Sequence, residues 1–116
     1  MTPTIIFKDE EPYLVLGSPG GSRIITTVLQ VALNVMEHGM NIAQAVNSPR
    51  IHHQWLPEVL MIEDGYGADT ESLLTNKGYR LYSSRTMGSV QAIVREGDYF
   101  YGAADPRRPS SGAVAP

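Results

Sequence analysis

The sequence contains no cysteine among its 116 residues. This absence excludes a disulfide framework, a thiolate-ligated zinc or iron–sulfur centre, and a cysteine nucleophile. No run of about 18 apolar residues occurs, so the sequence predicts no membrane-spanning helix. The start, Met1 to Ile5, lacks the basic residues and apolar stretch of a secretory signal. None of these absences fixes the compartment.

An excess of positive charge is also missing. Nine Lys and Arg stand against twelve Asp and Glu, for a formal net charge of −3. Nucleic-acid binding needs a concentrated excess of basic side chains, whereas here only Arg107 and Arg108 are adjacent. We therefore expect no nucleic-acid partner. The 42% of hydrophobic and 18% of charged residues are ordinary for a globular protein of this length.

The first part of the chain is predicted to form a hairpin followed by a long helix. Strands are expected at 3–8 and 13–16, on either side of a polar turn. The run at 13–16 does not alternate, as expected for a central strand covered on both faces. The helix over 23–37 is apolar around most of its circumference, which indicates burial in an assembly larger than this chain's own sheet and helices.

The second part is predicted to mix short helices and strands. Asn41 is expected to cap a short helix and Asp69 to cap another. Residues 50–57 are expected to be irregular. Strands are expected at the following ranges: 59–63, 79–83, 90–96 and 99–103.

This order of elements predicts an α+β fold, with a mostly antiparallel sheet and helices on one face. We expect one domain over 1–104. Residues 105–116 are rich in Pro, Ser, Gly and Ala, and are expected to form an extended or partly disordered, solvated tail.

The turn over 17–22, Gly-Ser-Pro-Gly-Gly-Ser, is the strongest candidate site. It precedes the long helix, so Gly20 and Gly21 could present backbone N–H groups to an anion or a developing oxyanion at the positive end of the helix dipole. The alternative is that the glycines only serve the turn. The spacing matches neither a P-loop nor Gly-x-Gly-x-x-Gly.

Other candidate residues carry weaker signals. Adjacent side chains in an extended segment point apart, so His52 and His53 do not form a metal site, and we expect them to pack or hydrogen-bond in a loop with Trp55. A Ser-His-Asp arrangement is compatible with the composition, but no serine is marked by its surroundings. Arg107 and Arg108 could bind a carboxylate or lie in a solvated tail.

Four segments together resemble the small subunit of the γ-glutamyltranspeptidases, in the same order. These are residues 16–27 (LGSPGGSRIITT), 47–57 (NSPRIHHQWLP), 87–93 (MGSVQAI) and 102–107 (GAADPR). The resemblance implies part of an N-terminal-nucleophile hydrolase with an αββα sandwich. It also implies that Gly20 and Gly21 donate N–H groups to the oxyanion, with no metal or cofactor required.

The resemblance further implies an enzyme that transfers the γ-glutamyl group of glutathione or related amides to water, amino acids or peptides. The nucleophile is an N-terminal threonine, and that threonine and a substrate-holding Ser-Ser pair belong upstream of Met1. Thr2 and Thr4 follow the position of that pair, so neither is assigned as nucleophile. No nucleophile is expected in this chain, and its substrate-binding residues are unassigned.

The expected partners are the rest of the small subunit, the large subunit and a γ-glutamyl small molecule. The chain alone is expected to be inactive and to self-associate through uncovered apolar faces. The resemblance implies a periplasmic, secreted or outward-facing enzyme. Two alternatives remain open: a related glutaryl or cephalosporin acylase, and a non-catalytic binding or dimerisation module.

Overall fold

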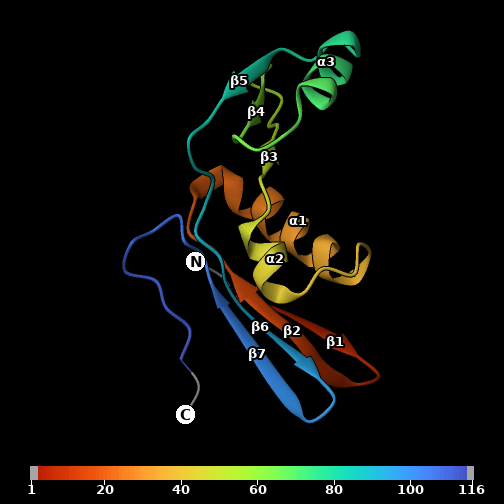
Figure 1. Cartoon of the computed structure of the whole chain (residues 1–116), viewed down its shortest axis with the longest axis vertical. Helices are drawn as coiled ribbons and strands as arrows, with labels where there is room; N and C mark the ends of the chain where they lie inside the picture. Colours follow the sequence, from red (N-terminus) through yellow and green to blue (C-terminus); the bar gives the residue numbers. More distant parts are fainter. Residues whose placement is uncertain (1–2, 115–116) are drawn as a thin grey trace. The chain divides into compact units, whose positions relative to one another are not determined.

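The structure is a computed structural model that describes residues 3–114. Its elements follow the chain in this order: β1 (Thr4–Lys8), β2 (Glu11–Gly17), a 3-10 turn η1 (Gly21–Arg23), α1 (Ile24–Met36), α2 (Ile42–Asn47), β3 (Ile51–His52), β4 (Leu60–Ile62), α3 (Ala68–Asn76), β5 (Leu81–Ser83), β6 (Gln91–Glu96) and β7 (Tyr99–Ala104) (Figure 1). The expected α+β class is confirmed.

The described residues group into two compact units. Unit 1 contains residues 3–48 and 88–114, and unit 2 contains residues 49–87. The single domain over 1–104 stays a prediction, and each unit is described by itself. Met1, Thr2 and the last two residues of the predicted tail lie outside the described residues.

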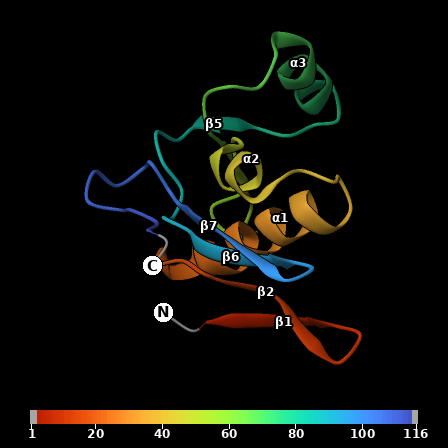
Figure 2. The ribbon, with the colours of Figure 1, turned by 60° about the horizontal axis from the view of Figure 1, so that its bottom comes forward.

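Unit 1 is a four-stranded antiparallel sheet in the order β1-β2-β6-β7, with α1 and α2 packed on one face (Figure 2). Leu14 lies opposite Val94, and Leu16 opposite Ala92, so alternate residues of two strands point to the same side. These side chains form the core with α1 and α2. The predicted arrangement, a mostly antiparallel sheet with helices on one face, is confirmed.

The other face of this sheet stays open in the described part of the chain. β2 is a central strand, as predicted, but its Val15 is 36% exposed, and Ile5 and Ile93 beside it are 52% and 49% exposed. The prediction that this strand is covered on both faces is therefore wrong within the described residues. An apolar row faces outward instead.

The long helix also keeps an uncovered apolar side. Val31 and Val35 are buried, whereas Ile25 and Leu29 are 76% and 52% exposed. Leu33 and Met36 continue this exposed stripe at helical spacing. The helix begins at Ile24 after the η1 turn, one residue later than predicted. Its two apolar sides support the expectation of a further packing layer.

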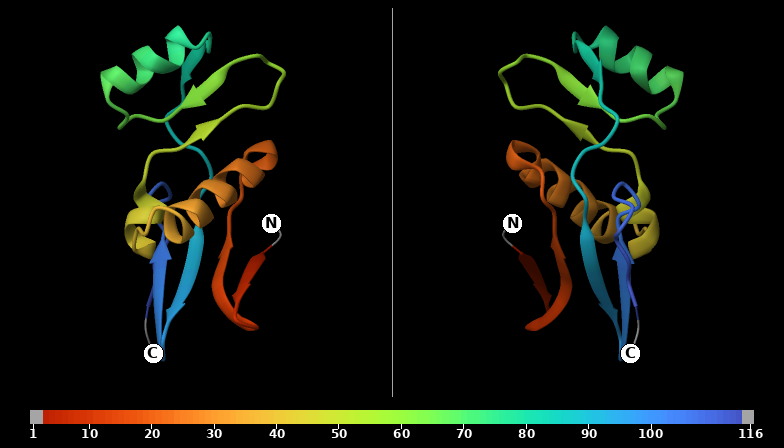
Figure 3. Two further views of the ribbon diagram at one scale, coloured as in Figure 1. Left: turned by 90° about the vertical axis from the view of Figure 1, so that its right-hand side faces the viewer. Right: turned by 90° about the vertical axis from the view of Figure 1, so that its left-hand side faces the viewer.

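Unit 2 holds a three-stranded mixed sheet in the order β3-β4-β5, in which β4 runs antiparallel to β3 and parallel to β5. α3 packs on β5 (Figure 3), and none of the residues of α3 is buried. β3 lies in the stretch predicted to be irregular. The sequence does not reveal this strand, because two residues are too few to show an alternating pattern.

The two predicted helix caps have different outcomes. Asn41 caps α2, and its side chain accepts the Gln44 N–H while the Gln44 side chain accepts the Asn41 N–H, which completes a capping box. The prediction for α3 is wrong, because Gly67 is the N-cap. Asp69 lies in the first turn, where its negative charge stabilises the positive end of the helix dipole.

Candidate functional site

The glycine turn of unit 1 leads from the end of β2 into α1. Gly20 has a φ of 150° and Gly21 a φ of 59°, values that favour glycine because a side chain would strain the backbone. The Arg23 N–H donates to the Gly20 carbonyl at 3.2 Å, which closes the short η1 turn. The sequence therefore places glycine where the chain must change abruptly from strand to helix.

The turn leaves two backbone donors without an acceptor. Within residues 3–114, no hydrogen bond uses the N–H of Gly20 or Gly21. A Cβ built on Gly21 would meet no atom within 4 Å apart from its chain neighbours, so there is free space on the side-chain side of this residue. Two free N–H groups ahead of a helix N-terminus form a ready site for negative charge. The oxyanion role of Gly20 and Gly21 stays a prediction.

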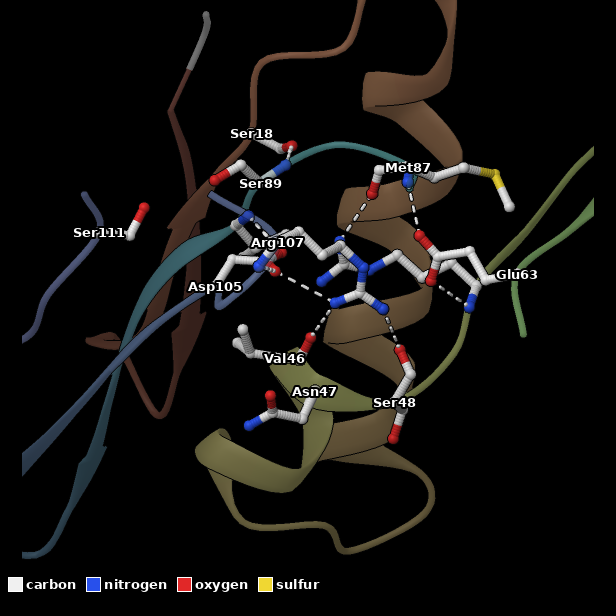
Figure 4. A network of polar contacts seen from close by, with 12 residues as sticks. Ser18, Val46, Asn47, Ser48, Glu63, Met87, Ser89, Asp105, Arg107 and Ser111 are labelled. Carbon is white, nitrogen blue, oxygen red and sulfur yellow. Dashed lines mark hydrogen bonds and ion pairs between the residues drawn. The ribbon is translucent and has the colours of Figure 1, made fainter. Parts of the chain in front are cut away.

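The segment around Gly88 packs tightly beside the turn. The buried Ser18 hydroxyl accepts the Ser89 N–H at 2.9 Å (Figure 4). It also donates to the Pro19 carbonyl at 2.7 Å. A Cβ on Gly88 would lie 2.5 Å from the Ser18 Oγ. Glycine is thus required at this position by both contact distance and its φ of 73°. The sequence interpretation missed this contact because 71 residues separate the two serines.

Asp105 and Arg107 anchor the start of the predicted tail. The fully buried Asp105 carboxylate accepts the Val90 N–H at 2.8 Å and binds the Arg107 guanidinium at 3.1 Å. Arg107 also donates to the carbonyls of Val46 and Ser48 at 3.0 and 2.9 Å, at the end of α2 (Figure 4). Carbonyls at a helix C-terminus lack partners within the helix, and Arg107 supplies one. The prediction of a solvated tail is wrong for these two residues. The alternative, that Arg107 binds a carboxylate, agrees with its ion pair with Asp105.

The rings of His52 and His53 have different hydrogen-bond partners. His52 Nε2 lies 2.9 Å from the Gln54 Oε1, and His53 Nδ1 accepts the Trp55 N–H at 3.2 Å. Among the described residues there is no cluster of His, Cys, Asp or Glu able to hold a metal. The predicted hydrogen bonding is present. The Trp55 side chain, however, is 76% exposed and does not pack into a core.

Unit 2 contains a buried polar cluster that the sequence interpretation missed. The Glu63 carboxylate accepts the backbone N–H groups of Arg50 and Met87, and the Arg50 guanidinium donates to the Met87 carbonyl at 2.7 Å. Arg50 and Glu63 are almost completely buried. The cluster joins the two ends of unit 2. No local spacing signals it, because the partners are 13 to 37 residues apart.

Tyr66 lies next to this cluster and donates its hydroxyl proton to the Pro49 carbonyl at 2.9 Å. Burial raises the pKa of the Tyr66 phenol above its ordinary value of 10.0, and the negative charge of Glu63 raises it further. The phenol therefore stays protonated around neutral pH and keeps its hydrogen bond.

Within residues 3–114, none of the helices has the length and apolar character needed to cross a membrane.

The fold defines the class first, because solved N-terminal-nucleophile hydrolases superpose on the chain. The γ-glutamyltranspeptidase of Helicobacter pylori, solved as a T380A mutant, matches with a TM-score of 0.88 and 50% identity, over 93% of this chain and 61% of that one. The cephalosporin acylase of Bacillus halodurans matches with a TM-score of 0.85 over 98% of this chain and 22% of that one, but is 21% identical. The acylase similarity shows the fold alone.

The sequence then places the chain within that class. Residues 1–115 match the γ-glutamyltranspeptidase family, and the glutathione hydrolase proenzyme of Escherichia coli K12 is 53% identical over 108 residues, which cover 92% of this chain. The chain belongs to the γ-glutamyltranspeptidase family. It spans 19% of the length of the E. coli protein and corresponds to a C-terminal part of the small subunit.

Proposed function

We propose that this chain supplies the oxyanion-binding turn of an enzyme that transfers the γ-glutamyl group of glutathione or related amides. The observation that carries the proposal is the pair of backbone N–H groups at Gly20 and Gly21, which have no hydrogen-bond acceptor within the described residues. Attack of a nucleophile on an amide carbonyl places negative charge on the carbonyl oxygen. Each well-placed donor to that oxygen accelerates such reactions about 10²- to 10³-fold.

The remaining catalytic parts come from outside this chain in this proposal. A threonine at the start of the complete small subunit attacks the γ-glutamyl amide, and its own α-amine takes the proton of the hydroxyl as base. The C–N bond of the amide then breaks, and the amine of the substrate leaves with that proton, which gives a threonine ester. Water or an amino acid then takes the γ-glutamyl group from the threonine ester. Gly20 and Gly21 stabilise the tetrahedral oxyanion in both steps, because each step passes through the same charged oxygen.

The uncovered apolar faces support the expected partners. The open face of the sheet in unit 1 includes Ile5, Val15 and Ile93, and the exposed stripe of α1 includes Ile25 and Leu29. We assign these faces to contacts with the rest of the small subunit and with the large subunit. A periplasmic, secreted or outward-facing location of the whole enzyme belongs to the same proposal.

A hybrid enzyme tests the function directly. It is the E. coli glutathione hydrolase proenzyme in which this chain replaces the matching segment, which shares 53% of its residues. We expect it to cleave γ-glutamyl-p-nitroanilide much faster than glutaryl-p-nitroanilide. In the hybrid the E. coli part supplies the substrate-binding residues upstream of this chain. The acylase alternative is therefore tested in the complete enzyme that carries this chain, where preference for the glutaryl amide would support it. A folded hybrid that cleaves neither amide would contradict the proposal and favour a non-catalytic module.

A further inference from the structure

We propose that the Ser18 hydroxyl is a positioning group that sets the direction of the Gly20 N–H for oxyanion binding. This inference rests on the proposed function, because it matters only if the turn binds an oxyanion. It concerns a side chain that touches neither the substrate nor the reacting atoms.

The direction of the Gly20 N–H follows from the geometry of one peptide unit. The Pro19 carbonyl and the Gly20 N–H belong to the same peptide unit, which is planar. Ser18 donates to the Pro19 carbonyl oxygen at 2.7 Å. A contact that fixes the direction of this oxygen also fixes the N–H on the opposite side of the plane. The Ser18 hydroxyl therefore orients one of the two proposed oxyanion donors.

The Ser18 hydroxyl is itself held by two hydrogen bonds. A serine hydroxyl has one proton to donate and lone pairs to accept with. The proton points to the Pro19 carbonyl. A lone pair of the hydroxyl oxygen therefore accepts the hydrogen bond from the Ser89 N–H at 2.9 Å. Ser18 is fully buried, and Ser89 is 3% exposed, which removes competition from bulk water. The hydroxyl therefore has a single favourable rotamer.

The packing around the Ser18–Ser89 contact is tight. A Cβ on Gly88 would lie 2.5 Å from the Ser18 Oγ and 3.0 Å from the Thr27 Cγ2. A Cβ on Gly20 would lie 3.6 Å from the Gly88 Cα, so the two backbones are close neighbours. The residues after Gly88 are fixed in turn, because the Val90 N–H donates to Asp105. The turn thus rests on a rigid support.

A purely structural role would satisfy the buried Ser89 N–H and nothing more. In that case Ser18→Ala would lower stability without changing the turnover of the enzyme that remains folded. A positioning role predicts a different result: turnover falls while substrate affinity changes little, since the oxyanion exists only during reaction. The two roles are therefore separated by kcat and KM.

The experiment compares Ser18→Ala with Ser72→Ala in the hybrid enzyme, with rates expressed per mole of folded enzyme. Ser72 is an exposed serine of α3 that donates to Ala68 within its own helix. We expect Ser18→Ala to lower kcat by about 10- to 100-fold with KM within about twofold, because small misplacements of catalytic groups have effects of this size. Ser72→Ala is expected to change neither. A kcat for Ser18→Ala within about twofold of the unmodified hybrid would overturn the inference.

A second pair of variants perturbs the Ser18 contact through the neighbouring Gly88. Gly88→Ala and Gly97→Ala both place alanine at a positive φ, 73° and 61°, but only the first collides with Ser18. We expect only Gly88→Ala to lower kcat, and equal effects of the two variants would overturn the inference. If Ser18→Ala does not fold, this pair decides.

Amide hydrogen exchange of residues 17–23 gives a readout independent of turnover. The Ser18→Ala turn should exchange faster than the unmodified turn, and unchanged exchange would overturn the inference even in an inactive hybrid. An unmodified hybrid without activity would contradict the proposed function. An active hybrid that tolerates Ser18→Ala would contradict only the role of Ser18.

Discussion

Unit 1 and unit 2 differ in what fills their interiors. In unit 1 the interior is an apolar layer between a sheet and two helices, and both outer surfaces of this layer keep exposed apolar rows. In unit 2 buried Leu60 and Ile62 are accompanied by the polar cluster of Arg50 and Glu63, and none of the residues of α3 is buried. Unit 1 thus leaves apolar surface uncovered within the described residues, whereas the interior of unit 2 includes a few directional polar contacts.

The largest stability effect is expected in unit 2, from Glu63→Ala. This change removes the acceptor of two buried backbone N–H groups, and each unsatisfied group costs about 1–3 kcal/mol. We expect a loss of about 3 kcal/mol in the unfolding free energy of this unit. Hydrogen exchange of β3, β4 and β5 measures it. Glu58→Ala, at an exposed site of the same unit, is the control. An equally small effect of both variants would remove the distinction between the units.

The next effect concerns the exposed stripe of α1 in unit 1. We expect the isolated chain to be inactive and to self-associate, and Leu29→Lys to weaken that association about tenfold, because covering a leucine contributes about 1.5–3 kcal/mol. Sedimentation over a concentration series measures it. Ser72→Lys, on exposed α3, should leave it unchanged. A monomeric isolated chain would show that unit 1 needs no further layer.

The smallest effect is a pH dependence of unit 2. The folded Tyr66 has a raised pKa, so folding favours the protonated phenol. Its contribution to stability is complete below pH 10.0, the ordinary pKa, and is lost as the pH rises through the raised value. Tyr66→Phe should lower the unfolding free energy by about 1 kcal/mol at neutral pH. The variant should also lose less stability as the pH rises into the alkaline range. Urea unfolding at several pH values measures this.

Tyr82→Phe provides the comparison for that titration, because Tyr82 is 59% exposed. It should leave the alkaline loss of stability in place. If both variants give the same profile, Tyr66 is not the group responsible.

Local sequence signals predicted the elements of unit 1 better than those of unit 2. The period of α1, the Asn41 cap and the turn residues at Gly20 and Gly21 act over a few residues, so they are visible in the sequence. β3 and the cap of α3 were mistaken, because the first is too short for a pattern and Gly67 competes with Asp69 as cap.

Contacts between distant parts of the chain were not predictable from the residues. The sequence predicts a tail from residue 105 onward and leaves carboxylate binding by Arg107 only as an alternative, since nothing in a Pro-rich segment shows that it returns to bind Val90 and the end of α2. The family resemblance pointed to Gly20 and Gly21 as donors. It did not reveal Ser18, whose partner Ser89 lies far along the chain.

The most direct test of the account is the effect of Gly21→Val on γ-glutamyl-p-nitroanilide cleavage by the hybrid enzyme. Gly39→Val is the matched control, because Gly39 has a φ of 63°, against 59° for Gly21, and neither Cβ would meet another residue within 4 Å, chain neighbours aside. The account predicts that Gly21→Val lowers kcat by at least about 100-fold and that Gly39→Val does not. Equal rates for the two folded variants would contradict an oxyanion role for the turn.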